Sequence, residues 1–259
     1  MEATMTEHPH TDEYARGVYV FVALALLTVV EFGVAILFES VPVLMLIAAA
    51  KVGLVLYYYM HISKLSIADE TLDHHTYAYK SNTNRLGLWL FLLSDAFVFA
   101  ALLVTRFNLL GLTRPHLDQL LGLVISSVLL VSSFFANRGE VAASAGDRKT
   151  FLSSIMVTIV LGTAFLLGVV ALEWPTAIAE GLTPSSGVAG AVFFMMTGMH
   201  ALHVLTGVIF LLIIYRNGRR GLYTPEKHYA VEAAAVYWHF VDVVWIFFYP
   251  ALYLIGTAL

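Results

Sequence analysis

The stretch that decides the fold is LGLWLFLLSDAFVFAALLVT, residues 86–105, in which Asp95 is the only ionisable side chain. About 20 mainly apolar residues in helical form cross roughly 30 Å of bilayer hydrocarbon. Over all 259 residues, 59% are hydrophobic and 12% are charged, whereas a soluble domain is about 25% charged. We therefore expect a helical membrane protein, and we exclude a soluble domain, a disordered chain and a nucleic-acid-binding protein.

Six further segments are long and apolar enough to span a bilayer. They are residues 17–38, 42–62, 117–136, 151–172, 188–215 and 231–257. Together with residues 86–105 they predict an all-α, polytopic bundle of seven transmembrane helices.

The orientation is predicted from the distribution of Lys and Arg. With seven spans, one face collects eleven of these cations: Arg16, Lys64, Lys80, Arg85, Arg138, Arg148, Lys149, Arg216, Arg219, Arg220 and Lys227. The opposite face has only Arg106 and Arg114. The positive-inside rule then predicts a cytoplasmic N-terminus and a C-terminus outside, on the periplasmic side. The first fifteen residues are acidic and polar, so we expect no cleavable signal peptide.

The connections are short except for the polar segment 63–85, which we interpret as a cytoplasmic linker. It divides the chain into a two-helix unit, residues 1–62, and a five-helix unit, residues 86–259. The chain has no cysteine and ten histidines, so histidine is the main candidate ligand for a transition metal.

Glu31 and Lys51 are ionisable residues inside the first two expected spans. A charge at the bilayer centre costs about 2.5–3.5 kcal/mol on the insertion scale unless it finds a partner. At about 1.5 Å per residue, their depths differ by roughly 4–5 Å. We therefore predict an ion pair between the two helices. The alternative is that Lys51 extends to the membrane surface and Glu31 is protonated.

Asp95 is isolated among Leu, Phe and Ala in the third span. Such a carboxylate could relay a proton, with a pKa that burial raises. It could instead be a polar anchor that is hydrogen-bonded to a neighbouring helix or a lipid headgroup, which is the interpretation we favour.

Histidines and acids also gather in the last spans. His200 and His203 are three residues apart and share a helix face, and His239 and Asp242 repeat this spacing in the seventh span. Two carboxylates lie at helix ends, Glu173 and Glu232. These groups could bind haem or a dinuclear metal site. They could also tie helices together through hydrogen bonds, and the spacing leaves both interpretations open.

Four motifs in residues 85–259 resemble subunit III of the haem-copper respiratory oxidases. They are LGLWLFLLSD (86–95), LEW (172–174), FFMMTGMHALH (193–203) and EAAAVYWHFVDVVW (232–245). The first two helices are similar instead to the small bacterial subunit IV, through LTVVEF (27–32) and AKVGLVLYYYMH (50–61). The resemblance suggests a fusion of subunit IV-like helices to a five-helix subunit III.

The resemblance implies a non-redox accessory subunit of a proton-pumping oxidase that transfers electrons from cytochrome c to O₂ in a bacterial cytoplasmic membrane. It implies no catalytic residue and no metal in this chain, with haem and copper held by the partner subunits I and II. It also implies bound phospholipid and support of proton uptake. The residues that would contact lipid or tie helices together are Asp95, Glu173, His200, His203, Glu232, His239 and Asp242. The family commonly has Glu at the position of Asp95.

Three other functions remain as alternatives. The same motifs fit subunit III of a quinol oxidase. A stand-alone haem or metal protein could use the three histidines of the last two spans. A proton-coupled transporter could use Glu31, Lys51 and Asp95, although no inverted repeat is apparent.

Overall fold

The computed structural model of the chain describes residues 10–38, 40–60 and 77–258. Helices dominate these residues, and seven of them are long and apolar enough to cross a membrane. The predicted all-α polytopic bundle is therefore confirmed. Most of the expected linker, residues 61–76, lies outside the described residues.

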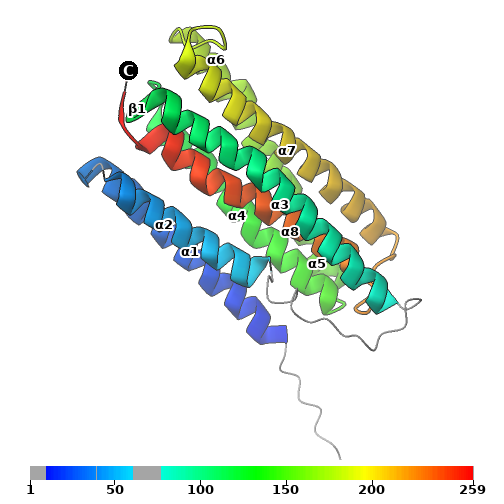
Figure 1. The fold of residues 1–259 in the computed structure, drawn as a ribbon. Coiled ribbons are helices and arrows are strands. Elements are labelled where there is room, and N and C mark those ends of the chain that lie inside the picture. The colour runs from blue at the N-terminus through cyan, green and yellow to red at the C-terminus, as the bar shows by residue number, and fades with distance from the viewer. Residues whose placement is uncertain (1–9, 39, 61–76, 259) are drawn as a thin grey trace, which may run out of the picture.

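The seven spans lie side by side (Figure 1). Their elements, in chain order, are α1 (His10–Phe38), α2 (Val41–Leu54) with η1 (Val55–Tyr59), α3 (Tyr77–Leu110), α4 (Gln119–Ser144), α5 (Arg148–Leu167) with η3 (Gly168–Glu173) and α6 (Trp174–Ala179), α7 (Val188–Arg219), and α8 (Tyr229–Tyr249) with η4 (Pro250–Leu254). The three η elements are π-helical turns.

Most of the helices extend beyond the apolar stretches that predict them, and two examples show how. The helix α3 begins at Tyr77, within the expected linker, and continues beyond residue 105 to Leu110. The fifth span does not end near Leu172 but continues through η3 and α6 to Ala179. Polar residues at the end of a span can stay helical beyond the hydrocarbon, because the helix satisfies their backbone hydrogen bonds. Hydropathy does not detect these polar helical ends.

The helix α8 is the centre of the bundle. It is buried along most of its apolar stretch, whereas every other span buries less than half of that stretch. Figure 1 shows α8 between α2 on one side and α3 on the other, with α7 beyond α3. The exposed apolar side chains of the outer helices are those that a bilayer or a partner subunit would cover.

Small residues on neighbouring helices make room for the indole ring of Trp238 on α8. A Cβ atom at Gly162 on α5 would collide with the Trp238 ring, and one at Gly207 on α7 would lie 2.8 Å from it. The indole Nε1 donates a 3.0 Å hydrogen bond to Ser132 Oγ on α4. One large side chain therefore fixes the distances of three helices from α8.

Arg106 closes the end of the bundle that carries the C-terminus. The positive-charge count placed it in the connection after the third span, but it belongs to α3 and is 0% exposed. Its guanidinium donates to the carbonyls of Ala251 (2.6 Å), Gly111 (2.7 Å), Thr113 (2.9 Å) and Ile255 (2.9 Å). The carbonyl groups at the C-terminal end of a helix have no donor within the helix. Arg106 supplies donors to such groups and so ties the end of α3 to the end of the last span.

A two-stranded parallel sheet completes the same end, with β1 (Thr113–Arg114) paired to β2 (Thr257–Ala258). Gly256, at φ +98°, precedes β2, and a Cβ there would collide with the carbonyl oxygen of Leu112. Only glycine fits this close approach without strain.

Candidate functional site

The structure brings Glu31 and Lys51 together. Glu31 on α1 is 0% exposed, Lys51 on α2 is 3% exposed, and the Lys51 Nζ atom lies 2.6 Å from Glu31 Oε2. The two helices follow each other in the chain and pack against each other, so side chains at similar depth can face each other. The two opposite charges compensate each other inside the membrane-spanning part of the bundle.

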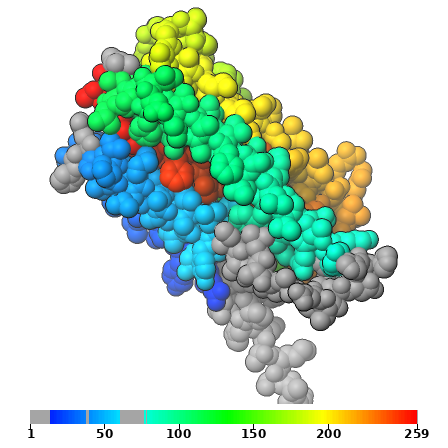
Figure 2. Space-filling view, viewed as in Figure 1, coloured from blue at the N-terminus to red at the C-terminus, as the bar shows by residue number. Residues whose placement is uncertain are grey.

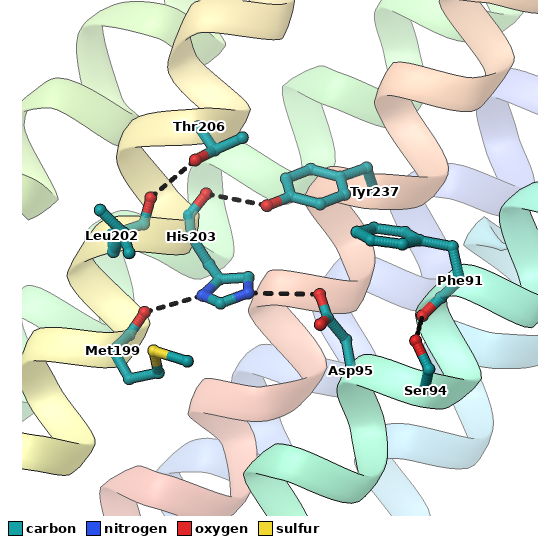
Figure 3. A network of polar contacts seen from close by, with 8 residues as sticks. All are labelled: Phe91, Ser94, Asp95, Met199, Leu202, His203, Thr206 and Tyr237. Atoms are coloured by element: carbon teal, nitrogen blue, oxygen red, sulfur yellow. Dashed lines mark hydrogen bonds and ion pairs between the residues drawn. The ribbon is translucent and has the colours of Figure 1, made fainter.

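Asp95 and His203 form a second polar contact, between α3 and α7 (Figure 3). His203 Nε2 lies 3.2 Å from Asp95 Oδ2, and His203 Nδ1 lies 2.8 Å from the carbonyl oxygen of Met199. From α8, the hydroxyl of Tyr237 donates to the carbonyl oxygen of His203 at 3.3 Å. Three helices thus meet at this imidazole.

The proton count of this contact follows from its geometry. A carbonyl oxygen only accepts, so Nδ1 of His203 must carry a hydrogen. The contact between Nε2 and Asp95 then needs one further proton, either on the imidazole, which makes an ion pair, or on the carboxyl group. In both arrangements the pair is neutral overall, and one proton is shared between the two side chains.

An apolar groove adjoins this pair. It has a volume of about 310 Å³ and is lined by residues of α3 and α8, among them Phe99, Leu103, Phe240 and Phe247. The ring of Phe99 packs edge-on against His203, with centroids 4.7 Å apart. In Figure 2, α8 is visible at the bottom of a depression between α2 and α3. The groove can accommodate an acyl chain beside a polar group.

His200 lies in different surroundings from His203. Its imidazole is 0% exposed and stacks on Trp245 at 4.8 Å, with Phe165 edge-on at 5.6 Å. Neither ring nitrogen has a hydrogen-bond partner among the described residues. The three-residue spacing therefore does not bring the two histidines to one ligand site.

His239 on α8 contacts Ser133 on α4. The Ser133 hydroxyl lies 2.7 Å from His239 Nδ1. Asp242, one turn further along α8, is 2% exposed. The ring of Tyr59 packs on His239 at 4.9 Å. The sequence pattern contained no signal for Ser133, which is one serine of a pair in an apolar helix.

The two carboxylates at helix ends have separate environments. Glu232, in the first turn of α8, accepts two hydrogen bonds from Arg85 on α3, at 2.8 and 2.9 Å. Sequence analysis placed Arg85 at the end of the linker and did not pair it. Glu173 lies in η3, is 4% exposed, and has no partner for its Oε2 among the described residues.

The comparisons with known proteins decide the family. The sequence model of cytochrome c oxidase subunit III matches residues 13–257. The curated cytochrome c oxidase subunit 3 of Felis catus is 34% identical over 197 residues, which is 71% of this chain and 74% of that protein. That of Equus caballus is 31% identical over 204 residues, or 74% of this chain and 77% of the relative. That of Bos taurus is 34% identical over 197 residues, with coverage of 71% and 74%.

The chain belongs to the cytochrome c oxidase subunit III family. It is a multi-pass membrane protein and, by family, a component of an enzyme complex. The subunit III match begins at residue 13 and so includes α1 and α2. The comparisons therefore give no support to a subunit IV origin for the first two helices.

The described residues contain no group of three or more His, Cys, Asp or Glu side chains that could hold a metal ion. The polar side chains lie on neighbouring helices and contact each other in pairs. Each of three contacts, Lys51–Glu31, Asp95–His203 and Arg85–Glu232, joins two helices. Their arrangement fits the helix-tying interpretation.

Proposed function

We propose that the chain is a non-redox accessory subunit of a proton-pumping haem-copper terminal oxidase. It stabilises subunit I, lies in one complex with subunits I and II, and binds phospholipid. Haem and copper belong to the partner subunits, and electrons pass from cytochrome c to O₂ there. The observation that carries this proposal is the subunit III match over residues 13–257.

The lipid part of the proposal rests on the groove between α3 and α8. An acyl chain lies in the groove of about 310 Å³, against Phe99 and Phe247, and a polar lipid group is positioned beside the Asp95–His203 pair. The side chains of this pair are 21% and 14% exposed, so a lipid can reach them. Apolar walls with a few convergent polar groups are typical of small-molecule sites.

The Asp95–His203 pair also supports a role in proton uptake. It holds one shared proton at a partly exposed position, and a group that can hold or release a proton can buffer the supply to a neighbouring subunit. Of the remaining polar residues, Glu232 and His239 tie helices together through their contacts with Arg85 and Ser133, and Glu173, His200 and Asp242 contact lipid or a neighbouring helix.

The chain is placed in a bacterial cytoplasmic membrane, with the N-terminus in the cytoplasm and the C-terminus outside. The distribution of Lys and Arg supports this orientation. Within the chain, residues 63–85 connect a two-helix unit, 1–62, to a five-helix unit, 86–259.

Purification through an affinity tag on this chain tests the proposal. Expected are stoichiometric haem- and copper-bearing subunits and oxygen consumption with reduced cytochrome c. Activity with a quinol alone would assign the chain to a quinol oxidase. A chain that purifies alone with its own Soret band, or that alone drives solute uptake in proteoliposomes, would overturn the accessory role.

A further inference from the structure

A second groove lies between α1, α4 and α5, at the end of the bundle where α1 begins. Figure 1 shows this end opposite β1, with the turn between α4 and α5 at the same end. The groove has a volume of about 310 Å³, which is enough for a small ligand or a lipid headgroup. It shares no lining residue with the apolar groove between α3 and α8, so it is a separate place on the molecule.

The lining of this groove changes from polar to apolar along the bundle. On α1, Tyr14 precedes Val18 by four residues, so the two side chains are stacked along the helix. On α4, Phe134 and Arg138 are stacked in the same way. In both helices the polar residue lies nearer the end of the bundle, and the apolar residue lies nearer its middle. The ring of Phe21 extends the apolar part, with its centroid 5.0 Å from that of Phe134.

Asn137 and Arg138 bring hydrogen-bond donors to the polar part of the groove. Asn137 is only 5% exposed, and its amide group has no hydrogen-bond partner within the described part of the chain. Gly17 on α1 leaves room for this amide, because a Cβ atom there would lie 2.6 Å from Asn137 Nδ2. Arg138 is partly exposed and forms no ion pair with another described residue. A buried amide that lacks a partner costs free energy, so a ligand that accepts its hydrogen is favoured.

Asp147 brings a negative charge to the same groove. It is the exposed N-cap of α5, and its Oδ1 accepts from Thr150 N–H at 3.1 Å. A carboxylate has two oxygens and about four acceptor positions, so the cap leaves acceptors for a ligand. The turn is held by a 2.9 Å bond from Asp147 N–H to the carbonyl oxygen of Ala142. Arg138 and Asp147 form no ion pair with each other, so the groove presents a cation and an anion separately.

We propose that this groove binds a zwitterionic phospholipid with a primary ammonium group in its headgroup, as in phosphatidylethanolamine. The phosphate oxygens accept from the Arg138 guanidinium and the Asn137 amide, because a guanidinium matches phosphate geometry. The ammonium group donates to Asp147, and an acyl chain lies along Val18 and Phe134.

The two charges of the groove select among headgroups. A purely anionic headgroup would be repelled by Asp147, and a choline headgroup has no N–H group to donate to it. The step from polar to apolar lining favours a lipid over a water-soluble phosphate compound, because only the lipid covers Val18 and Phe134. The inference goes beyond the proposed function and requires only that the bundle lies in a membrane.

Cross-linking of the purified complex in phosphatidylcholine nanodiscs tests the proposal. Phosphatidylethanolamine, phosphatidylglycerol and phosphatidylcholine with a photoreactive acyl chain are titrated in turn, and labelled peptides of α1 and α4 are quantified by mass spectrometry. The ethanolamine lipid is expected to label these peptides at the lowest concentration. Asp147→Asn keeps an N-cap residue, so it should weaken binding of the ethanolamine lipid about threefold to fivefold, as expected for a partly exposed charge pair, without weakening binding of the glycerol lipid. Arg138→Gln should weaken binding of both lipids.

Asp118→Asn is the matched control. Asp118 is the N-cap of α4, where it accepts from the N–H groups of Leu120 and Leu121, and it does not line this groove. Labelling in this variant should equal that of the wild type. Should Arg138→Gln fail to assemble, the comparison of Asp147→Asn with Asp118→Asn still decides.

Two results would overturn the proposal. One is equal labelling by the ethanolamine and choline lipids in the wild type, and the other is unchanged selectivity in Asp147→Asn. Competition by water-soluble phosphorylethanolamine as strong as that by the intact lipid would overturn the lipid assignment and leave a headgroup site. Co-purification of the other subunits tests the proposed function independently.

Discussion

Replacing Lys51 with methionine tests whether the buried ion pair holds the first two helices together. Lys51 Nζ lies 2.6 Å from Glu31 Oε2, and both residues are almost fully buried. Methionine keeps the length of the side chain but removes the charge, so Glu31 loses its partner inside the bundle. Removing one member of a buried pair typically costs about 3–5 kcal/mol, because the other charge is left uncompensated.

The expected loss for Lys51→Met is at the lower end of this range, about 3 kcal/mol, because Glu31 can take up a proton instead of remaining charged. That corresponds to roughly a 150-fold change in the unfolding equilibrium. In the double variant Glu31→Gln/Lys51→Met no buried charge remains. Its loss should be about 1 kcal/mol or less, since replacing a whole buried pair with neutral side chains is often neutral.

The assay is surfactant denaturation of the chain in lipid bicelles, followed by circular dichroism, for both single variants and the double variant. Leu46→Met on α2 is the matched control, because Leu46 is 70% exposed and pairs with no charge. A loss below about 1 kcal/mol for Lys51→Met would refute the reasoning, as would single losses that simply add up in the double variant.

Three further changes test other contacts. Asp95→Asn should leave the metals of the complex in place but shorten the turnover lifetime of the oxidase, because the shared proton of the His203 contact is lost; an unchanged lifetime argues against a functional carboxyl group. Arg106→Lys cannot reach all four carbonyls with one ammonium group, so the free energy of unfolding should fall by about 2–3 kcal/mol, and a change below 0.5 kcal/mol would contradict this role. Asp147 caps α5 by accepting from Thr150 N–H at 3.1 Å. Hydrogen bonding by the side chain of Thr150, and then by its backbone N–H, holds the pKa of this exposed carboxyl group below its usual value. Asp147→Ala should therefore cost about 1 kcal/mol at pH 7, and the difference from wild type should shrink as the pH falls from about 4 through the lowered pKa of Asp147; a difference that stays the same from neutral pH to below that pKa would exclude the ionised cap.

Hydropathy and motif order predicted the membrane bundle and the family because these signals are local. A run such as residues 86–105 must be helical in hydrocarbon, whatever its neighbours are, since no water can satisfy its backbone. The ordered motifs likewise identify subunit III without knowledge of any contact.

Local sequence patterns predicted the ends of the helices and the subunit origin of the first two helices less well. The expected end of the third span at residue 105 left Arg106 outside, because a buried arginine cannot be distinguished from an exposed one by sequence. The similarity of two short apolar motifs suggested a subunit IV origin that the match from residue 13 does not support.

The sequence by itself determined the membrane spans and the place within them of Glu31, Lys51 and Asp95, but not that of Arg106. Only the tertiary structure decided the partners of those side chains. The depths of Glu31 and Lys51 could be compared through a short turn, but Arg85 and Glu232 are 147 residues apart, and Asp95 and His203 are 108 apart. The partner of a buried polar group depends on how helices pack and rotate against α8, and that depends on the volumes of residues such as Gly162 and Trp238 rather than on any periodicity.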